Sequence, residues 1–285
     1  MKRSLMKYIS LALALVFAAS LIGCGSNNGG QTVVIDIEDP TAAPVTAAPT
    51  AVPTEVPTEA PTPEPTAQPN PGKRKVYLTF DDGPYKYTDQ FLAVLAQYNV
   101  RATFFTIGDQ IEKYPEQAKH ILEGGHVLGC HTQTHNLNAI YASTDALVRD
   151  IAKWRETVIK AVGSDAGAYV MRFPGGTTNT TIGGRKGRDP YVAAVNAAGY
   201  YAFDWNLGIN DRWLAGNTQG LSKVDWYWYS YQDTYATFQN TDPLILIIHD
   251  TEPTSLDILA RIIEDLIAKG FDFGTVDEIG DNYLM

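Results

Sequence analysis

From about residue 75 onward, short apolar runs alternate with stretches whose apolar residues recur at helical spacing. Short apolar runs are typical of buried strands, and apolar residues three and four apart are typical of helices. Strands that alternate with helices predict a parallel sheet, because each helix returns the chain to the end where the next strand starts. The expected strands are 76–80, 102–107, 126–130, 169–173, 200–205, 244–249 and 271–276. The expected helices are 88–98, 115–123, 144–162, 190–198, 226–238 and 255–268.

Polar side chains stand where most of these strands end. They are Asp81 and Asp82 after the first strand, His131 and His135 after the third, then Arg172, Asp204 and His249 at the fourth, fifth and sixth. An open doubly wound sheet would spread such residues along a wide edge. In a barrel, the carboxyl ends of the strands meet at one mouth, where barrel active sites are built. The convergence favours a barrel.

The first residues have the pattern of a secretory signal. Three cations precede the apolar run 9–22, which contains no charge and is short for a membrane span. The run ends in Leu-Ile-Gly followed by Cys24, which resembles the bacterial lipobox, where cleavage precedes the Cys and its thiol receives a lipid. An ordinary signal peptide or a short uncleaved anchor is the alternative. We therefore expect a lipoprotein signal peptide over 1–23 and an extracytoplasmic protein anchored to the membrane through Cys24.

Residues 24–72 are rich in Thr, Pro and Ala. Few apolar side chains and frequent Pro cannot support a packed core, so this segment is expected to be a disordered linker. In polyproline geometry, the Pro-rich stretch 40–71 could reach roughly 100 Å from the membrane. The remaining residues, 73–285, are long enough for one domain with a single large core.

Cysteine usage and charge restrict the fold and its partners. The chain has 2 Cys, and if Cys24 carries a lipid then Cys130 has no disulfide partner, so a hydrophobic core must hold the fold. The formal net charge of −10 argues against nucleic acid or an anionic surface as a partner.

Asp81 and Asp82 place two carboxylates where the first strand must end. Neighbouring side chains in a regular strand point to opposite faces. Because Gly83 and Pro84 break the strand, both carboxylates can enter one pocket from different directions. An exposed turn is the alternative, since all four residue types are common in turns.

His131 and His135 are four residues apart, so on a helical turn or tight loop they share a face and can share a metal. Imidazole suits Zn²⁺, and two His with one carboxylate leave positions open for water and substrate. One structural and one surface His is the alternative.

Two further segments carry groups that a catalytic pocket needs. Arg172 begins Arg-Phe-Pro-Gly-Gly, where an Arg beside acidic residues would orient a carboxylate and glycines expose backbone N–H groups toward an oxyanion. A strand end with a turn is the alternative. His249 ends a fully apolar strand, where it could act as a general acid.

Four segments resemble, in order and spacing, the polysaccharide deacetylases of carbohydrate esterase family four, also called the NodB-homology domain. They are Thr-Phe-Asp-Asp-Gly-Pro, His-x-x-x-His, Arg-x-Pro-x-Gly and Leu-x-x-His, and the resemblance spans about residues 74–280. It implies an α/β fold, a distorted (β/α)₇ barrel. It also implies one divalent metal, Zn²⁺ or alternatively Co²⁺, bound by Asp82, His131 and His135.

The resemblance further implies the catalytic roles. Asp81 is the general base held by Arg172, and it takes the proton of a water that attacks the acetamide carbonyl. The Gly175 N–H and the metal hold the oxyanion, and His249 protonates the leaving amine. Acetate and a glucosamine unit are released without a covalent intermediate.

One part of the pattern is incomplete. The family often has an Asp three residues after a Trp in the fifth strand, and here that position is Gly208. We expect Asp204 or Asp211 to orient His249 instead, with Asp204 preferred.

Trp205 and Leu246 are expected to line an apolar wall beside the acetyl methyl group, or else to pack in the core.

The chain is therefore expected to be a metal-dependent hydrolase that removes N-acetyl groups from an amino-sugar polysaccharide, either peptidoglycan or chitin oligomers. An O-acetyl esterase acting on xylan-type glycans and a non-catalytic wall-binding lipoprotein are the alternatives. An acid His matters more for an amine than for an alcohol leaving group, which favours N-deacetylation. The expected partners are the polysaccharide and, through the lipid, the membrane, with no nucleic acid, and the protein is expected to act as a monomer.

Overall fold

The computed structural model describes residues 73–212, 218 and 220–285. The predicted signal peptide (1–23), the lipidation site Cys24 and the predicted linker (24–72) lie outside the described residues. Over the described ranges, we find no helix with the length and apolar character that a membrane crossing requires.

The described residues form one sheet of 8 strands, and all of its ladders are parallel. The strand order is β5-β4-β3-β2-β1-β7-β6, with β8 paired to β1. The strands are β1 (Lys75–Asp81), β2 (Thr103–Thr106), β3 (Val127–Cys130), β4 (Val170–Met171), β5 (Tyr201–Ala202), β6 (Leu207–Gly208), β7 (Leu244–His249) and β8 (Asp272–Gly274). Each of the seven predicted strands has a counterpart. The prediction missed β6, because two residues are too short to form a pattern.

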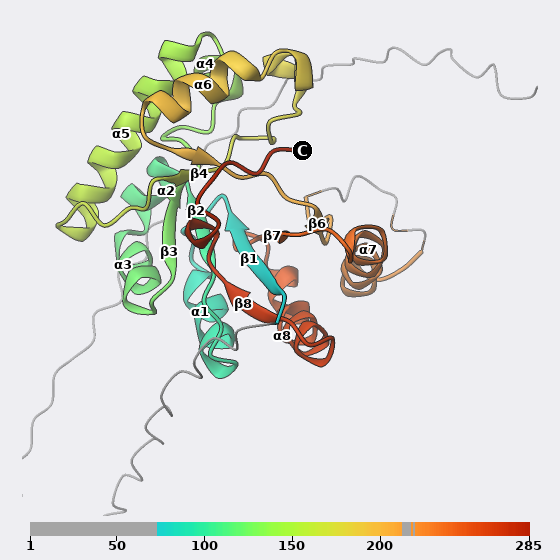
Figure 1. The fold of residues 1–285 in the computed structure, drawn as a ribbon. Coiled ribbons are helices and arrows are strands. Elements are labelled where there is room, and N and C mark those ends of the chain that lie inside the picture. Colours follow the sequence, from blue (N-terminus) through green and yellow to red (C-terminus); the bar gives the residue numbers. More distant parts are fainter. Residues whose placement is uncertain (1–72, 213–217, 219) are drawn as a thin grey trace, which may run out of the picture. The chain divides into compact units, whose positions relative to one another are not determined.

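β1 is the central strand, as Figure 1 shows. One of its edges pairs with β7, and the other pairs with β8 in its first half and β2 in its second half. The register sets Asp81 directly beside His249 of β7. Two residues far apart in the sequence therefore meet at the carboxyl end of the sheet.

The predicted distorted barrel is confirmed, and its distortion lies between β5 and β6. No ladder joins these two strands within the described residues. Instead, the segment around Tyr283 runs beside β5: the Tyr283 N–H donates to Ala202 O over 2.9 Å, and the Asp204 N–H donates to Tyr283 O over 2.7 Å. This segment supplies the backbone partners that a neighbouring strand would otherwise supply.

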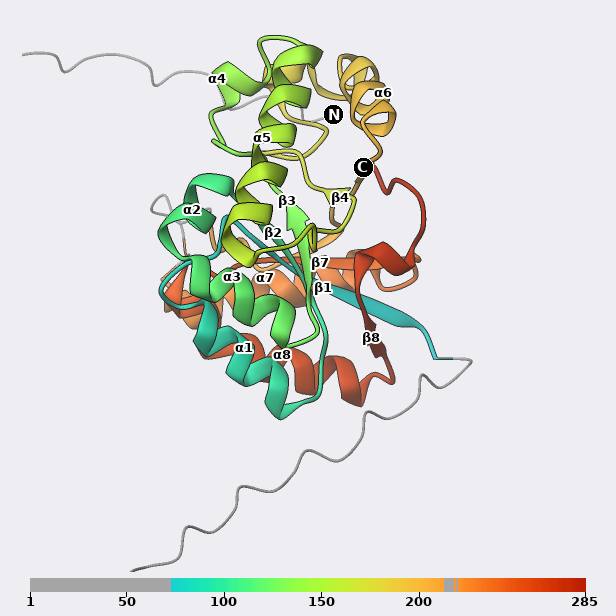
Figure 2. The same cartoon turned by 90° about the vertical axis from the view of Figure 1, so that its left-hand side faces the viewer.

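Helices cover the outer face of the curled sheet, with α1 beside α8 and α3 in both views (Figures 1 and 2). The helices are α1 (Thr88–Gln97), α2 (Gly108–Lys113), α3 (Pro115–Glu123), α4 (Leu137–Ile140), α5 (Thr144–Val162), α6 (Asp189–Ala197), α7 (Lys223–Phe238) and α8 (Pro253–Ala268), with short 3₁₀ turns η1 (Thr180–Ile182), η2 (Gly184–Lys186) and η3 (Val276–Glu278). All six predicted helices are present, and α3 and α5 have the predicted bounds. The sequence pattern did not predict α2 and α4, which are one to two turns long.

The ends of α5 show why its bounds could be predicted. The Ser143 side chain accepts a hydrogen bond from the Ala146 N–H over 3.1 Å, which satisfies one of the free amides of the first turn. Gly163 ends the helix at φ +76°, a left-handed conformation that glycine adopts without steric cost.

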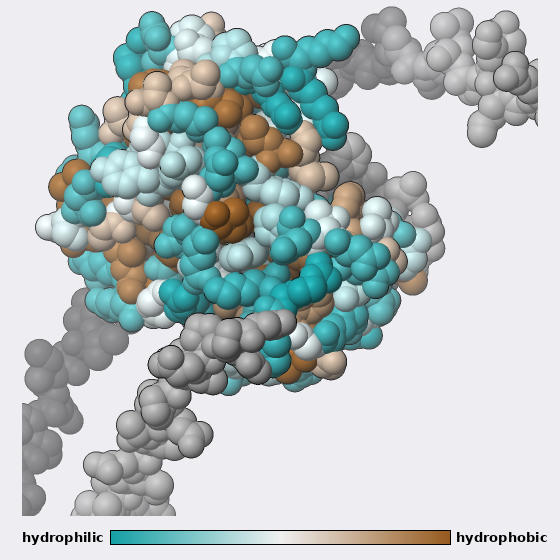
Figure 3. Space-filling model, viewed as in Figure 1, coloured by the Kyte–Doolittle hydropathy of each residue, from teal (hydrophilic) through white to brown (hydrophobic). Residues whose placement is uncertain are grey.

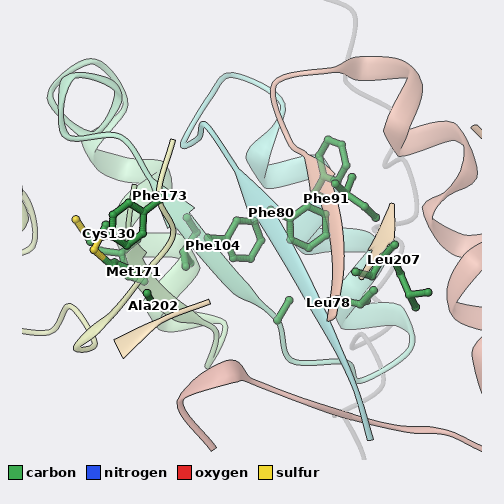
Figure 4. Close-up of a cluster of buried hydrophobic side chains, with 14 of the residues drawn as sticks. Leu78, Phe80, Phe91, Phe104, Cys130, Met171, Phe173, Ala202 and Leu207 are labelled. Atoms are coloured by element: carbon green, nitrogen blue, oxygen red, sulfur yellow. The ribbon is translucent and has the colours of Figure 1, made fainter. Parts of the chain in front are cut away.

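Residues of β1 alternate between two hydrophobic clusters. Leu78 and Phe80 face the helices, where the Phe80 ring stacks on Phe104 at 4.7 Å and meets Phe91 edge-on at 5.5 Å (Figure 4). Tyr77 belongs to a second cluster inside the curl of the sheet. Its other members include residues from β2, β4, β7 and η3, the turn that follows β8. Because side chains alternate along a strand, Asp81 lies on the same inner face as Tyr77.

The face of the molecule shown in Figure 3 is mostly hydrophilic, with hydrophobic side chains in small groups. Large hydrophobic side chains that are exposed on the described residues are scattered along the chain: Ile159, Tyr169, Tyr201, Leu221, Tyr229 and Ile267.

Candidate active site

A cavity of about 630 Å³ opens among residues at the carboxyl ends of the strands. Seven of the predicted site residues line it: Asp81, Asp82, His131, His135, Gly175, Trp205 and His249. The structure therefore brings together residues from the ends of β1 and β7 and from the loops after β1, β3, β4 and β5. Arg172 lies behind this lining, in contact with Asp81.

Asp81 is the last residue of β1 and is 2 % exposed. Its Oδ1 accepts a hydrogen bond of 2.7 Å from the fully buried Arg172 guanidinium. Arg172 is itself fixed, because its Nε donates to Phe203 O over 2.8 Å and its Nη1 also donates to Thr79 Oγ1 over 2.7 Å. A buried ion pair needs such full pairing to offset the loss of hydration. Asp81 is thus held in one orientation, with its Oδ2 3.9 Å from His131 Nε2.

Asp82 follows the strand and has a left-handed backbone, with φ +71°. A residue with a side chain rarely adopts this conformation, and it persists only where the surroundings enforce it. Here it turns the carboxylate away from the Asp81 direction. The Asp82 Oδ1 lies 3.4 Å from His131 Nε2 and 3.5 Å from His135 Nε2.

His131 and His135 present the same ring nitrogen to Asp82. The buried His131 has its Nδ1 2.9 Å from the Arg172 carbonyl oxygen, so Nδ1–H donates there and the Nε2 lone pair faces the cavity. His135, at φ +53°, donates its backbone N–H to Thr132 Oγ1 over 3.1 Å.

The three side chains fit a divalent metal. One ligand atom from each of Asp82, His131 and His135 lies within 4.8 Å of the other two. Two imidazoles and a carboxylate suit Zn²⁺ and leave coordination positions free for water or substrate. Cys130 does not join the cluster, because its buried sulfur accepts from the Thr132 N–H over 3.3 Å.

The electrostatics of the site favour an ionised Asp82 and a neutral His135. Burial raises the pKa of Asp82, but the hydrogen bond and charge of His131, with the charges of His249 and His135, outweigh it and hold the pKa below its usual range. Burial lowers the pKa of His135, and the charge of His131 lowers it further. A carboxylate and a neutral imidazole are the forms that coordinate metals.

Asp211 positions His249. The Asp211 Oδ1 lies 2.7 Å from His249 Nδ1, and its Oδ2 accepts from the His249 backbone N–H and from Ser255 Oγ, each over 2.8 Å. Burial lowers the pKa of His249, but the hydrogen bond and charge of Asp211, with the charges of Asp81 and Asp82, outweigh it and raise the pKa above its usual range. His249 is thereby kept protonated to higher pH, as a general acid requires.

The preference for Asp204 as the partner of His249 is wrong. Asp204 Oδ1 accepts from the Thr177 N–H over 2.9 Å, and Oδ2 accepts from Thr177 Oγ1 and from the Met285 N–H. Asp204 follows β5 at the far side of the sheet, whereas Asp211 follows β6, the direct neighbour of β7. Only the strand order shows this, and β6 was missing from the predicted elements.

Leu246 does not line the cavity, contrary to its assignment to an apolar wall. It is fully buried in the helix-facing core, and Ile247 lines the cavity in its place. Because side chains alternate along β7, the residue two before His249 shares its face and the residue three before does not. Counting by twos from His249 would have identified Ile247 from the sequence.

Gly175 lies in a left-handed turn at φ +78° and lines the cavity. No described residue accepts a hydrogen bond from its N–H, whereas the N–H of Gly176 donates to Phe173 O over 2.7 Å. Gly176 has φ +74°, and a Cβ there would come within 3.1 Å of the Trp205 ring. The two glycines thus allow the loop to pass close to Trp205 at the cavity wall.

Arg212 is a site residue that the sequence did not reveal. Its half-exposed guanidinium contacts Asp82 Oδ2 and donates to Thr251 Oγ1 over 3.0 Å. The contact uses the carboxylate oxygen that does not face His131 and His135. An Arg in an irregular loop has no distinctive sequence signal, so only the fold could identify it.

The family model described as "Polysaccharide deacetylase" matches residues 68–194. A peptidoglycan-N-acetylglucosamine deacetylase from Bacillus cereus is 30% identical over 214 residues, which are 73% of this chain and 90% of the relative.

Two solved structures share the fold. The catalytic domain of peptidoglycan N-acetylglucosamine deacetylase from Eubacterium rectale has a TM-score of 0.61 and 32% identity, and the match covers 72% of this chain and 89% of that domain. A CE4 esterase from Streptococcus mutans has a TM-score of 0.62 and 25% identity, and the match covers 72% of this chain and 86% of the esterase.

Proposed function

Since the chain belongs to the polysaccharide deacetylase family and is a hydrolase of that family, we propose that it removes N-acetyl groups from an amino-sugar polysaccharide by a metal-dependent reaction. The observation that carries the proposal is one cavity holding a fixed carboxylate, a candidate metal triad and an Asp-supported His. A wall-binding module would need no such combination of base and acid.

Asp82, His131 and His135 would hold the metal. A divalent ion bound there supplies Lewis acidity, which polarises an amide carbonyl and makes water a better nucleophile. The His131 hydrogen bond to the Arg172 carbonyl supports this assignment, because it leaves Nε2 free to coordinate.

Asp81 would act as the general base. Its Oδ1 is occupied by Arg172, so Oδ2 is the atom available to take a proton from the attacking water. Arg172 stays on the opposite side of the carboxylate and keeps the base from rotating. Arg172 is thus a positioning residue rather than a catalytic one.

His249 would protonate the leaving amine through its Nε2, because Asp211 occupies Nδ1. Asp211 favours the imidazolium form, and a positioned acid contributes most when the leaving group is a poor one such as an amine. This supports N-deacetylation over removal of O-acetyl groups.

The Gly175 N–H would donate to the carbonyl oxygen as negative charge develops on it. Its lack of an acceptor among the described residues supports this role. Trp205 and Ile247, which both line the cavity, would exclude water on the side of the acetyl methyl group.

Peptidoglycan N-acetylglucosamine is the proposed substrate, ahead of chitin oligomers. The activity for which the relatives from Bacillus cereus and Eubacterium rectale are named supports this choice. So does the lipobox-like sequence at Cys24, which would keep the enzyme beside the cell's own wall. If Cys24 carries the lipid, Cys24→Ala should move the protein from the membrane fraction to the medium, and unchanged membrane retention would exclude this anchor.

Acetate release tests the function directly. The metal-loaded enzyme is incubated with peptidoglycan, chitin oligomers and acetylated xylan, each with and without a chelator. We expect acetate from peptidoglycan, with a smaller amount from chitin oligomers, and none after chelation. Release only from acetylated xylan would favour the esterase alternative, and release that a chelator does not affect would exclude the metal mechanism.

A further inference from the structure

The segment between the two proposed His ligands has no regular secondary structure and an unfavourable backbone. Thr132 has φ +70° and His135 has φ +53°. A left-handed conformation is strained for a β-branched residue such as Thr, and it persists only where neighbouring groups enforce it. Contacts outside the segment must therefore set the spacing of the two imidazoles.

Asp150, on α5, makes a charged contact to the backbone of this segment. Its Oδ1 accepts from the Gln133 N–H over 2.5 Å and from the Thr134 N–H over 3.3 Å. Its Oδ2 accepts from Thr134 Oγ1 over 3.0 Å. Hydrogen bonds to an ionised acceptor are about twice as strong as neutral ones, so one carboxylate fixes two successive peptide groups between the ligands.

The buried Gln133 side chain completes the attachment. Its Oε1 accepts from Thr157 Oγ1 of α5 over 2.9 Å, and its Nε2 donates to Asp109 Oδ1 of α2 over 2.9 Å. The Gly108 N–H donates to the Thr132 carbonyl over 3.0 Å, and a Cβ on Gly108 would lie 1.9 Å from Gln133 Oε1. Two helices thus hold the ligand loop. Within the described residues, Asp150 is the only charged group that accepts from the backbone N–H groups of Gln133 and Thr134.

The attachment of α5 to the core does not depend on Asp150. The helix packs through Leu147, Ile151, Trp154 and Val158, which are each 1 % exposed or less. Loss of the Asp150 carboxylate would leave this packing in place and remove only its hydrogen bonds to the loop.

We propose that Asp150 is a positioning residue of the metal site, and this inference rests on the proposed metal ligation by His131 and His135. By holding the peptide groups of Gln133 and Thr134, it sets the distance between the two imidazoles before a metal arrives. A loop that is already ordered loses less conformational entropy when its side chains coordinate an ion, so the ion binds more tightly.

The test compares Asp150→Ala and Asp150→Asn with Glu156→Ala. Glu156 is an exposed carboxylate on the same helix, so its replacement is the matched control. Zn²⁺ affinity is measured by competition with a chromophoric chelator, the ligand geometry by the absorption spectrum of the Co²⁺-loaded protein, and folding by thermal unfolding with and without metal.

We expect Asp150→Ala to weaken Zn²⁺ binding by about 10- to 100-fold, the usual range for groups that orient metal ligands. Its Co²⁺ spectrum should change as well. Asp150→Asn should lose less affinity, because its amide oxygen can still accept from the Gln133 N–H, and it reports on the site should the Ala variant not fold. Glu156→Ala should match the wild type.

Two results would overturn the inference, and they are distinguishable. A lower unfolding temperature with unchanged Zn²⁺ affinity and Co²⁺ spectrum in both Asp150 variants would assign Asp150 a structural role alone. Failure of the wild-type protein itself to bind Zn²⁺ or Co²⁺ would remove the metal site, and this inference with it.

Discussion

Asp81 and Asp82 are adjacent and chemically identical, yet they face different partners. Asp81 is the last residue of β1, is 2 % exposed and pairs with a buried guanidinium. Asp82 is the first residue beyond the strand, has a left-handed backbone and faces two imidazoles. The end of the strand is what separates them, because the pleat no longer dictates where the second side chain points.

The difference shows how two adjacent carboxylates can be suited to two different roles. A carboxylate that a cation holds on one oxygen is suited to move a proton with the other. A carboxylate that shares its surroundings with imidazole nitrogens is suited to share a metal with them. Replacing each carboxylate in turn therefore tests whether the two tasks are separate.

The largest expected effect separates Asp82 from Asp81. Asp82→Ala removes one of three proposed ligands, so we expect Zn²⁺ binding to be lost and activity to fall to that of the chelated enzyme. Asp81→Asn should retain the metal while kcat falls by about 10²- to 10⁴-fold, the range typical for a general base. Chelator competition and acetate release measure the two properties. Loss of metal from both variants would show that the carboxylates act as one unit.

The next effect concerns a third carboxylate, Asp250, which forms no salt bridge within the described residues. It is fully buried, its Oδ2 accepts from Thr88 Oγ1 over 2.5 Å, and Oδ1 has no partner among the described residues. Burial raises the pKa of Asp250 to about 7. In the unfolded chain, Asp250 ionises near pH 4. Its contribution to the free energy of unfolding is therefore fully present below that pH and is lost as the pH rises through about 7.

Asp250→Asn removes this pH dependence. In chelated protein, we expect the free energy of unfolding of the wild type, relative to the variant, to fall by about 4 kcal/mol between pH 4 and pH 8. Denaturant unfolding at several pH values measures the difference. Asp257→Asn, which replaces an exposed carboxylate on α8, is the control. A wild-type stability that stays parallel to that of Asp250→Asn would show that Asp250 is ionised in the fold.

The smallest expected effect distinguishes Asp211 from Asp204. Asp211→Asn removes the charge that raises the pKa of His249. His249 therefore loses its proton at lower pH, and the alkaline limb of the kcat–pH profile moves to lower pH. Above the new limb, activity should fall roughly tenfold for each pH unit by which the limb moves. Asp204→Asn should leave this limb in place, because its carboxylate contacts Thr177 and Met285. Equal shifts in both variants would contradict the assignment.

Local patterns predicted the longer elements well. The periodic apolar residues predicted α5 at its actual bounds, where the structure shows Ser143 as its N-cap and Gly163 as its C-cap. β6 has two residues and no periodicity, so it could not be recognised. The error at Asp204 followed from that omission. With β6 missing, the predicted strand 200–205, which contains Asp204, became the neighbour of the predicted strand that ends at His249. In the structure, β6 lies beside that strand, β7.

The candidate site shows the same division. The spacing of His131 and His135 predicted a shared metal, and the family resemblance implied Asp82 as the third ligand. The structure places the ligand atoms of all three within 4.8 Å of one another. Arg212 and Asp150 could not be predicted, because each contacts the site across a distance in sequence that leaves no local signal.

The sequence by itself determined the fold class, the order of its main elements and the residues able to form a metal site. These properties depend on periodicity, turn residues and donor types, which are local. Tertiary structure alone decided which carboxylate serves His249, which β7 side chain faces the cavity, and which groups hold the ligand loop. Those choices depend on strand order, register and the backbone conformation after β1, and all three arise only when distant segments pack together.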